Sequence, residues 1–226
     1  MKFIFFYLYL FLPLLLMANT LNKTDYLAHE IPQNMSVSMK KERFFYLIAP
    51  AVKKIHTKLL NKFLQVEKSI KNKTDIKEIN NLKYIYRVKT DSELLEALKP
   101  HPQSIVLAQA AIESAWATSR FFKEANNTFG MWSANAKEPR IAANIKREGV
   151  RTIWLRKFNS IEESIQAYYK LIAQGKAFKD FRHLRLKNSN PHELVKKLDK
   201  YSEIGAKYGE ELSKIIRYNK LEKYDK

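Results

Sequence analysis

The chain has no cysteine among its 226 residues. It can therefore form neither disulfide bonds nor metal–thiolate sites, and it has no thiol nucleophile. The histidines do not compensate, because no pair of them has the spacing of metal ligands, so we expect no metal and no cofactor. The histidines considered, all in Lys-rich or Pro-rich segments, are His56, His101, His183 and His192.

Acidic residues are also scarce. The chain has 23 Asp and Glu against 41 Lys and Arg, a formal net charge of +18. Such a charge favours polyanionic partners, such as nucleic acid, anionic lipid or the cell-wall polymer. Nothing resembles a zinc finger, an RNP motif or a homeodomain helix, so we predict no nucleic-acid partner. The length and the absence of repeats indicate one core with a helical extension, and we expect a monomer.

Long hydrophobic runs are limited to the N-terminus. Lys2 precedes an apolar run over residues 3–17, which closes at Ala18. A charged residue before a short apolar run is typical of a secretory signal peptide. The run falls a little short of the roughly 20 residues that span a bilayer. Residues 1–18 are therefore predicted to be a signal peptide or, as the alternative, an N-terminal anchor in the inner membrane, and the protein to be exported to the periplasm or cell envelope.

The next segments indicate a leader and a helical extension. Residues 19–37 are polar and predict a flexible leader, and residues 38–98 predict an N-terminal helical extension. Apolar residues recur at helical spacing over 39–69, with Pro50 expected to kink or interrupt the helix. The Lys/Asn-rich stretch 71–81 predicts a loop or short turn, and a short helix follows over residues 91–98.

Residues 107–121, LAQAAIESAWATSRF, hold one carboxylate in a small and apolar helical segment. Burial disfavours the charged form of Glu113 and raises its pKa, which suits a general acid. If the segment is one helix, Gln109, Glu113 and Trp116 share a face. The amide would then orient the acid and the indole would keep water from it.

These residues, followed by NNTFGMW at 126–132, resemble the Bax-type glucosaminidase family, which is related to the glucosaminidase domains of bacterial autolysins and of the flagellar peptidoglycan hydrolase. Residues 158–168 and 201–212 match as well, so the resemblance covers most of residues 40–220. Ala117 stands where the family usually has glycine, and its extra methyl is expected to tighten helix packing beside the site without removing any chemistry. The resemblance implies a glucosaminidase catalytic domain at 99–220.

The implied fold is mainly α with a small β-hairpin lobe, a lysozyme-like glucosaminidase fold. β-Branched and aromatic residues over 150–158 predict a strand of that hairpin. Ser160 and Glu163 form a capping box for a helix that Gly175 ends. Asn190 and Pro191 begin another helix, and a last one runs from residue 203 or 205 to about residue 218.

The family resemblance implies an endo-β-N-acetylglucosaminidase that cleaves the peptidoglycan glycan strand. Glu113 is the predicted general acid, because cleavage requires a proton on the leaving oxygen. In related enzymes a Glu of the β-lobe acts on the other face of the sugar. Glu148 is favoured over Glu138 for this role, because it lies at the edge of the predicted strand among basic residues. Substrate assistance by the N-acetyl group, with no second acid, stays open.

The remaining site residues follow in part from the resemblance and in part from the chemistry of their side chains. Tyr201 corresponds to a cleft tyrosine that orients water or the substrate amide. Asn127, Phe129 and Gly130 form the turn after the catalytic helix, where each could equally be structural. Trp132 and Trp154 could stack on sugars or simply cover the core. The predicted substrate-binding residues are Gln109, Trp116, Asn127, Phe129, Gly130 and Trp132.

Two alternative functions stay open. A lytic transglycosylase shares the lysozyme-like fold and a single Glu-Ser pair, here Glu113 and Ser114. A basic cell-wall-binding protein without catalysis would need only the positive charge, and its binding would weaken steeply with salt.

Overall fold

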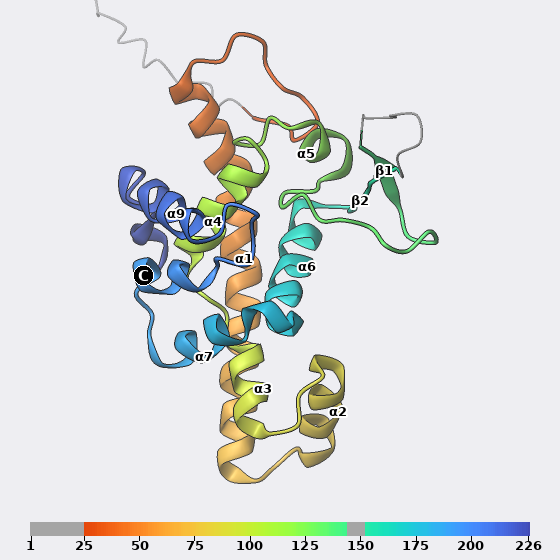
Figure 1. Ribbon diagram of the computed structural model, residues 1–226, viewed down its shortest axis with the longest axis vertical. Coiled ribbons are helices and arrows are strands. Elements are labelled where there is room, and N and C mark those ends of the chain that lie inside the picture. Colours follow the sequence, from red (N-terminus) through yellow and green to blue (C-terminus); the bar gives the residue numbers. More distant parts are fainter. Residues whose placement is uncertain (1–24, 144–151) are drawn as a thin grey trace, which may run out of the picture.

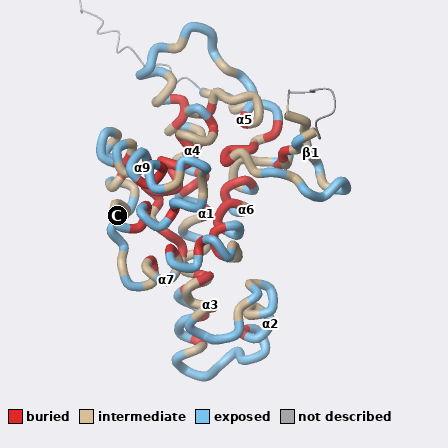
Figure 2. Tube along the Cα trace, viewed as in Figure 1, coloured by how far each residue is buried: buried red, intermediate tan, exposed pale blue. Residues whose placement is uncertain are grey.

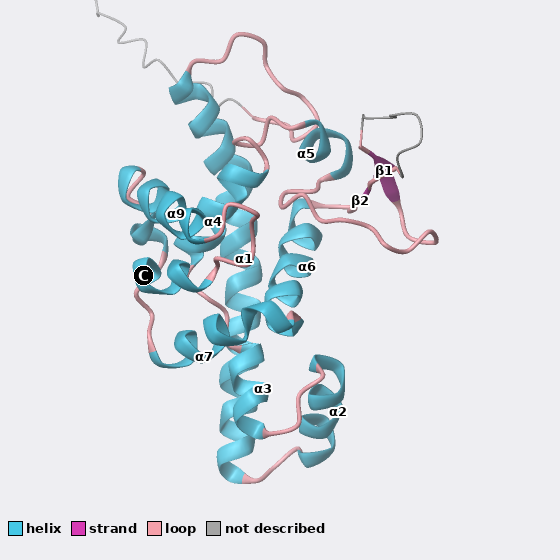
Figure 3. Ribbon diagram, in the orientation of Figure 1, coloured by secondary structure: helices cyan, strands magenta, loops and turns pink. Residues whose placement is uncertain are grey.

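The computed structural model describes residues 25–143 and 152–226. Figure 1 shows helices gathered around one long central helix, with a small hairpin projecting from one side. The helices are α1 (Val37–Asn72), α2 (Ile76–Tyr86), α3 (Asp91–Leu98), α4 (Gln103–Glu113), α5 (Arg120–Ala125), α6 (Ile161–Gln174), α7 (Lys179–Lys187), α8 (Pro191–Leu194) and α9 (Ala206–Tyr218). The strands are β1 (Arg140–Ala142) and β2 (Trp154–Arg156), and short 3-10 turns are η1 (Lys176–Phe178), η2 (Val195–Lys197) and η3 (Leu221–Tyr224). The predicted mainly α fold with a small β-hairpin lobe is confirmed (Figure 3).

Helix α1 organises the main core. Phe44, Ile48 and Val52 recur at intervals of four residues and are fully buried. They belong to one apolar cluster with residues of α4, α6 and α9, which fills the centre of the molecule (Figure 2). The expectation that Pro50 interrupts this helix is wrong, because α1 continues through it. Pro50 and Tyr46 lie on the exposed side, so water can reach the carbonyl that the missing proline N–H would have bonded.

The lower end of α1 forms a second, smaller cluster with α2 and α3. The predicted loop at 71–81 is also wrong: α1 runs to Asn72 and α2 begins at Ile76, with three residues between them. The helices extend further than expected because each supplies apolar side chains to this cluster. Its buried members are Phe63, Val66, Ile79, Leu94 and Leu98. The predicted extension at 38–98 thus divides between two clusters.

The described part of the leader, residues 25–36, is fixed to α1 by buried Arg43. The Arg43 guanidinium donates hydrogen bonds to the carbonyls of Leu27, Ala28 and Glu30, at 2.8, 3.0 and 2.9 Å. Three charge-assisted bonds from one side chain hold this segment in place without helix or strand.

Side-chain caps set the starts of several helices, and the caps at Ser160 and Asn190 are those that the sequence predicts. Thr90 Oγ1 accepts from the Glu93 N–H at 3.1 Å, in a complete capping box. Ser160 Oγ accepts from the Glu163 N–H at 3.2 Å, and α6 ends at Gly175. Asn190 caps α8, whose first residue is Pro191.

The hairpin is shorter than predicted. β1 and β2 are antiparallel, with Ile141 opposite Leu155, and each has three residues. Leu155 is the strand residue that is buried, and it also forms a β-bridge with Trp132. The first two residues of the predicted strand at 150–158, and Glu148, lie outside the described residues.

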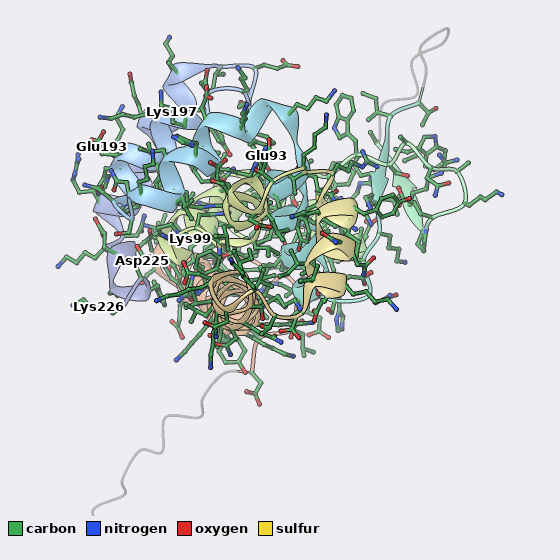
Figure 4. The ribbon with its side chains drawn as sticks, turned by 90° about the horizontal axis from the view of Figure 1, so that it is seen from below. Glu93, Lys99, Glu193, Lys197, Asp225 and Lys226 are labelled. Atoms are coloured by element: carbon green, nitrogen blue, oxygen red, sulfur yellow. The ribbon has the colours of Figure 1, made fainter. Side chains whose placement is uncertain are left out.

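Charged side chains extend outward on all sides in the view along α1 (Figure 4). Glu193 and Lys197, for example, lie across the molecule from the hairpin. This agrees with basic residues spread over helical faces. Within residues 25–143 and 152–226, no helix is both long and apolar enough to span a membrane. The predicted signal peptide or anchor at 1–18 precedes those residues.

Candidate active site

Glu113 is the last residue of α4 and faces a cleft of about 450 Å³. It is the one carboxylate among the described residues that line the cleft. The other lining side chains are mostly apolar or aromatic, so the acid lies in surroundings of low polarity. They are Phe129, Gly130, Met131, Trp132, Leu171, Phe178 and Tyr201.

A left-handed turn ends α4 directly after Glu113. Ala115, Trp116 and Ala117 have φ angles of +50°, +62° and +61°. Left-handed backbone costs roughly 1–2 kcal/mol per non-glycine residue, so this turn requires support. Ser114 Oγ accepts from the Ala117 N–H at 2.8 Å, and Arg43 donates to the Ala117 carbonyl at 2.7 Å.

Two predictions for this segment are therefore wrong. Residues 107–121 are not one helix, and Trp116 does not share a face with Glu113. Trp116 packs instead edge-on against Phe44 of α1, with ring centroids 5.1 Å apart. Ala117 lies in the turn rather than within a helix, and its positive φ explains why glycine suits this position.

Burial raises the pKa of Glu113, and one hydrogen bond opposes that rise. The Tyr208 hydroxyl, from α9, donates to Oε1 of Glu113 at 2.7 Å, which favours the ionised form. Desolvation is the larger effect, so the pKa lies above the usual value for Glu. The C-terminal end of α4 also disfavours negative charge. The environment therefore favours a carboxylic acid that keeps its proton at higher pH than an exposed Glu.

Gln109 is fully buried and does not line the cleft, so the prediction that it binds substrate is wrong. Its amide group donates to the Tyr208 hydroxyl at 3.1 Å, and its carbonyl oxygen accepts from the Tyr168 hydroxyl. Gln109 thus orients the acid indirectly, through Tyr208.

Tyr201 lines the cleft together with Glu113. Its ring stacks on Tyr208, with centroids 5.4 Å apart and planes within 11°. Two stacked tyrosines on one side of the acid restrict its movement. This position agrees with a role for Tyr201 in the cleft.

The turn over residues 126–130 is mainly structural. Asn127 is 1% exposed, and its amide group donates to the carbonyls of Met131 and Arg156. Its Oδ1 accepts from the Met131 N–H at 2.8 Å, which leaves no amide group for a ligand. Asn127 therefore braces the hairpin instead of binding substrate. Phe129 is 4% exposed and stacks on Tyr168 at 4.1 Å, although one edge reaches the cleft.

The hairpin side of the cleft is exposed. Gly130 has φ +62° and turns the chain toward Trp132, whose side chain is 72% exposed. Trp132 and Trp154 line a second hollow along the hairpin, and the Arg140 guanidinium lies 4.3 Å from the Trp154 ring. Both indoles are positioned where a ligand could stack on them.

Of the two candidates for the second acid, Glu138 and Glu148, only Glu138 belongs to the described residues. Glu138 forms an ion pair with Arg156, Oε2 to Nε at 3.2 Å, and does not line the cleft. Glu148 falls within 144–151, outside the described residues.

Tyr208, which hydrogen-bonds Glu113, is a residue of this site that the sequence did not predict. It lies in the matching segment at 201–212, but the partner of its hydroxyl group becomes known only when α9 is seen to pack against α4. The same holds for Leu171 and Phe178, which reach the cleft from α6 and η1. From the sequence alone, a tyrosine on the apolar face of an amphipathic helix is predicted to be a core residue.

Comparisons with known proteins agree with this architecture. The glucosaminidase family model, described as mannosyl-glycoprotein endo-beta-N-acetylglucosaminidase, matches residues 89–221. The protein named bax from Escherichia coli is 28% identical over 132 residues, 56% of this chain and 46% of that protein. The chain thus spans less than half the length of this relative.

The catalytic domain of the autolysin Auto from Listeria monocytogenes has a similar fold. Its TM-score is 0.50 at 18% identity, over 84% of this chain and 90% of that one. The glycoside hydrolase domain of FlgJ from Salmonella typhimurium matches 65% of this chain and 89% of its own, with 19% identity and a TM-score of 0.42. The family match covers more than half of the chain and includes Glu113, Tyr201 and Tyr208. The chain therefore belongs to the glucosaminidase family, as its resemblance to the Bax-type members predicts.

Proposed function

We propose that the protein is an exported peptidoglycan hydrolase, an endo-β-N-acetylglucosaminidase with Glu113 as its general acid. The observation that carries the proposal is the burial of Glu113 as the one carboxylate among the described residues of an aromatic cleft. Membership of the glucosaminidase family supports the reaction class.

Glycoside cleavage needs a proton at the leaving oxygen while positive charge develops at the sugar carbon. Neutral Glu113 supplies this proton. Because burial raises its pKa, Glu113 stays protonated to higher pH than an exposed Glu does. Tyr201 lies on the same cleft and orients the attacking water or the N-acetyl group of the substrate.

The proposed second acid is Glu148 rather than Glu138. The ion pair with Arg156 directs the Glu138 carboxylate to the hairpin itself. Glu148→Gln should therefore lower turnover by about 10²–10⁴-fold if it acts as a base, whereas Glu138→Gln should leave turnover nearly unchanged. If both variants retain full turnover, the substrate's own N-acetyl group is the remaining nucleophile.

The proposed substrate is the peptidoglycan glycan strand. The Listeria relative is an autolysin, and a structural neighbour from Sphingomonas sp. A1 is named a peptidoglycan hydrolase. A net charge of +18 suits a polymer whose stems carry carboxylates. The apolar run at 3–17 would bring the protein to that polymer by export, either cleaved or retained as an anchor.

The deciding experiment incubates the full chain, wild type and Glu113→Gln, with purified sacculi and identifies the released ends by mass spectrometry. A high-mannose glycoprotein serves as a second substrate, because the family description names that class. Reducing N-acetylglucosamine ends from wild type alone would support the proposal. Anhydro-muramyl ends would identify a lytic transglycosylase. Salt-sensitive binding without any product would identify a wall-binding protein.

A further inference from the structure

A buried row of hydrogen-bonded side chains connects Glu113 to the opposite side of the core. We call it the buried chain, and its members are Arg185 of α7, His101 before α4, Tyr168 of α6, Gln109 of α4 and Tyr208 of α9. Its side chains come from separate elements and meet only in the folded core. No step of the proposed reaction uses the first three.

The contacts are continuous. Arg185 Nη1 lies 3.3 Å from His101 Nδ1, and His101 Nε2 lies 2.9 Å from the Tyr168 hydroxyl. Tyr168 contacts Gln109 Oε1, and Gln109 Nε2 lies 3.1 Å from the Tyr208 hydroxyl. Tyr208 reaches Oε1 of Glu113 at 2.7 Å.

The two ends fix the direction of every bond. A guanidinium can only donate, so His101 Nδ1 must accept from Arg185. The proton of neutral His101 is then on Nε2 and is donated to Tyr168. Tyr168 in turn donates to the carbonyl oxygen of Gln109, which turns the amide group toward Tyr208. The Tyr208 proton is left for Glu113.

We propose that the buried chain is a positioning device that makes Oε1 of Glu113 a permanent acceptor, so that Oε2 carries the acidic proton into the cleft. A proton on Oε1 would have to be donated to Tyr208. One possibility is that every hydrogen bond of the buried chain reverses its direction, so that two N–H donors, one on His101 and one on Arg185, face each other. The other is that the Tyr208 hydroxyl loses its acceptor. Both alternatives are unfavourable, because a buried polar group without a hydrogen-bond partner destabilises the fold.

The surroundings agree with a neutral His101. Burial, then the charge of Arg185 and then His56 of α1, lower the pKa of His101 well below its usual value. The rings of Tyr169 and Phe181 also face it, at 4.7 and 5.3 Å. Among the described residues, the titratable groups around Glu113 are the hydroxyls of Tyr208, Tyr201 and Tyr168, none of them charged near neutrality.

The catalytic consequence rests on the proposed glycosidase function. The direction of the hydrogen bonds in the buried chain does not, so two measurements test the two claims separately. The first measurement is the tautomer of His101 in the full-length protein. It is read from ¹⁵N NMR shifts, and the His101 signals are assigned with His101→Asn. We expect neutral His101 with its proton on Nε2 from pH 5 to 8. A proton on Nδ1, or a charged ring at pH 6, would overturn the proposal.

The second measurement compares variants of α7. Arg185→Met removes the fixed donor to His101, and Arg185→Lys keeps a donor there. Arg182→Met is the matched control, because Arg182 donates to the carbonyls of Ile172 and Gly175, which are not part of the buried chain. We expect mixed His101 tautomers and a raised Glu113 pKa, followed by ¹³C carboxyl NMR, in Arg185→Met alone. Glu113→Gln assigns that signal.

In activity, Arg185→Met should lose about two- to tenfold in kcat with KM unchanged, far less than the ~10²–10⁴ attributed to a general acid. The high-pH limb of its profile should move upward, and Arg185→Lys should restore the wild-type limb. An Arg185→Met variant with wild-type tautomer and Glu113 titration refutes the proposal. A wild type without hydrolysis but with the Nε2 tautomer refutes only the proposed function.

Discussion

The helical side of the cleft is buried and hydrogen-bonded, whereas the hairpin side is exposed. On the first, Glu113 bonds Tyr208, which Gln109 holds from a fully buried position. On the second, Trp132 is 72% exposed on a loop beside two strands of three residues each. In the proposed reaction, this difference assigns proton transfer to the buried side and substrate contact to the hairpin side.

Phe129→Ala should have the largest effect on stability. Phe129 joins the two sides, because it belongs to the turn before the hairpin yet stacks on Tyr168 in the core. Removing a buried phenyl ring costs about 3–5 kcal/mol. Denaturant unfolding measures the loss, with Phe121→Ala as the control, since Phe121 is only partly buried at the start of α5. Equal stability of the two variants would show that the sides are independently stable.

Tyr208→Phe should destabilise the protein by about 1–3 kcal/mol, because Gln109 loses a buried acceptor. It also removes the donor that favours ionised Glu113, so the pKa of Glu113 rises. A general acid then stays protonated to higher pH, and the high-pH limb of activity moves upward. Tyr218→Phe is the control from the same helix, with its side chain 81% exposed. An unchanged limb would contradict the assignment of Glu113 as the acid.

Much of this arrangement can be predicted from the sequence, and the exceptions have a common cause. Local signals sufficed for the capped helices at Ser160 and Asn190, and for Glu113 as a lone acid in an apolar segment. They failed at residues 114–117, where alanine favours a helix. The left-handed turn there depends on Arg43, which lies 74 positions earlier in the chain.

The site residues divide in the same way. Glu113, Tyr201 and Trp132 line the cleft, and their roles in the reaction stay predictions. Gln109, Trp116 and Asn127 do not line it, because a polar or aromatic residue beside a catalytic motif can equally contact a buried neighbour. Only packing shows which partner each side chain meets.

Trp132→Ala should separate binding from folding. An exposed side chain contributes little to stability, so unfolding should change by no more than about 0.5 kcal/mol. If the indole stacks on a sugar, its loss costs about 0.5–1.5 kcal/mol, up to roughly tenfold in KM. Initial rates on soluble glycan strands of graded concentration measure this. A fall in kcat with KM unchanged would assign Trp132 to the chemistry instead of to substrate binding.

Glu113→Gln should change stability only a little and, unlike Phe129→Ala and Tyr208→Phe, should raise it near neutral pH. The folded pKa of Glu113 lies above its unfolded value, so the native state holds a proton that the unfolded state has released. Wild-type stability therefore falls as pH rises from the ordinary Glu value through the folded pKa, and Gln escapes this penalty. We expect the variant to have the higher Tm at pH 7, and the gap to close toward pH 4. Tm curves that stay parallel between pH 4 and pH 7 would mean that burial does not disfavour the Glu113 carboxylate, and the argument for a neutral acid in this cleft would fail.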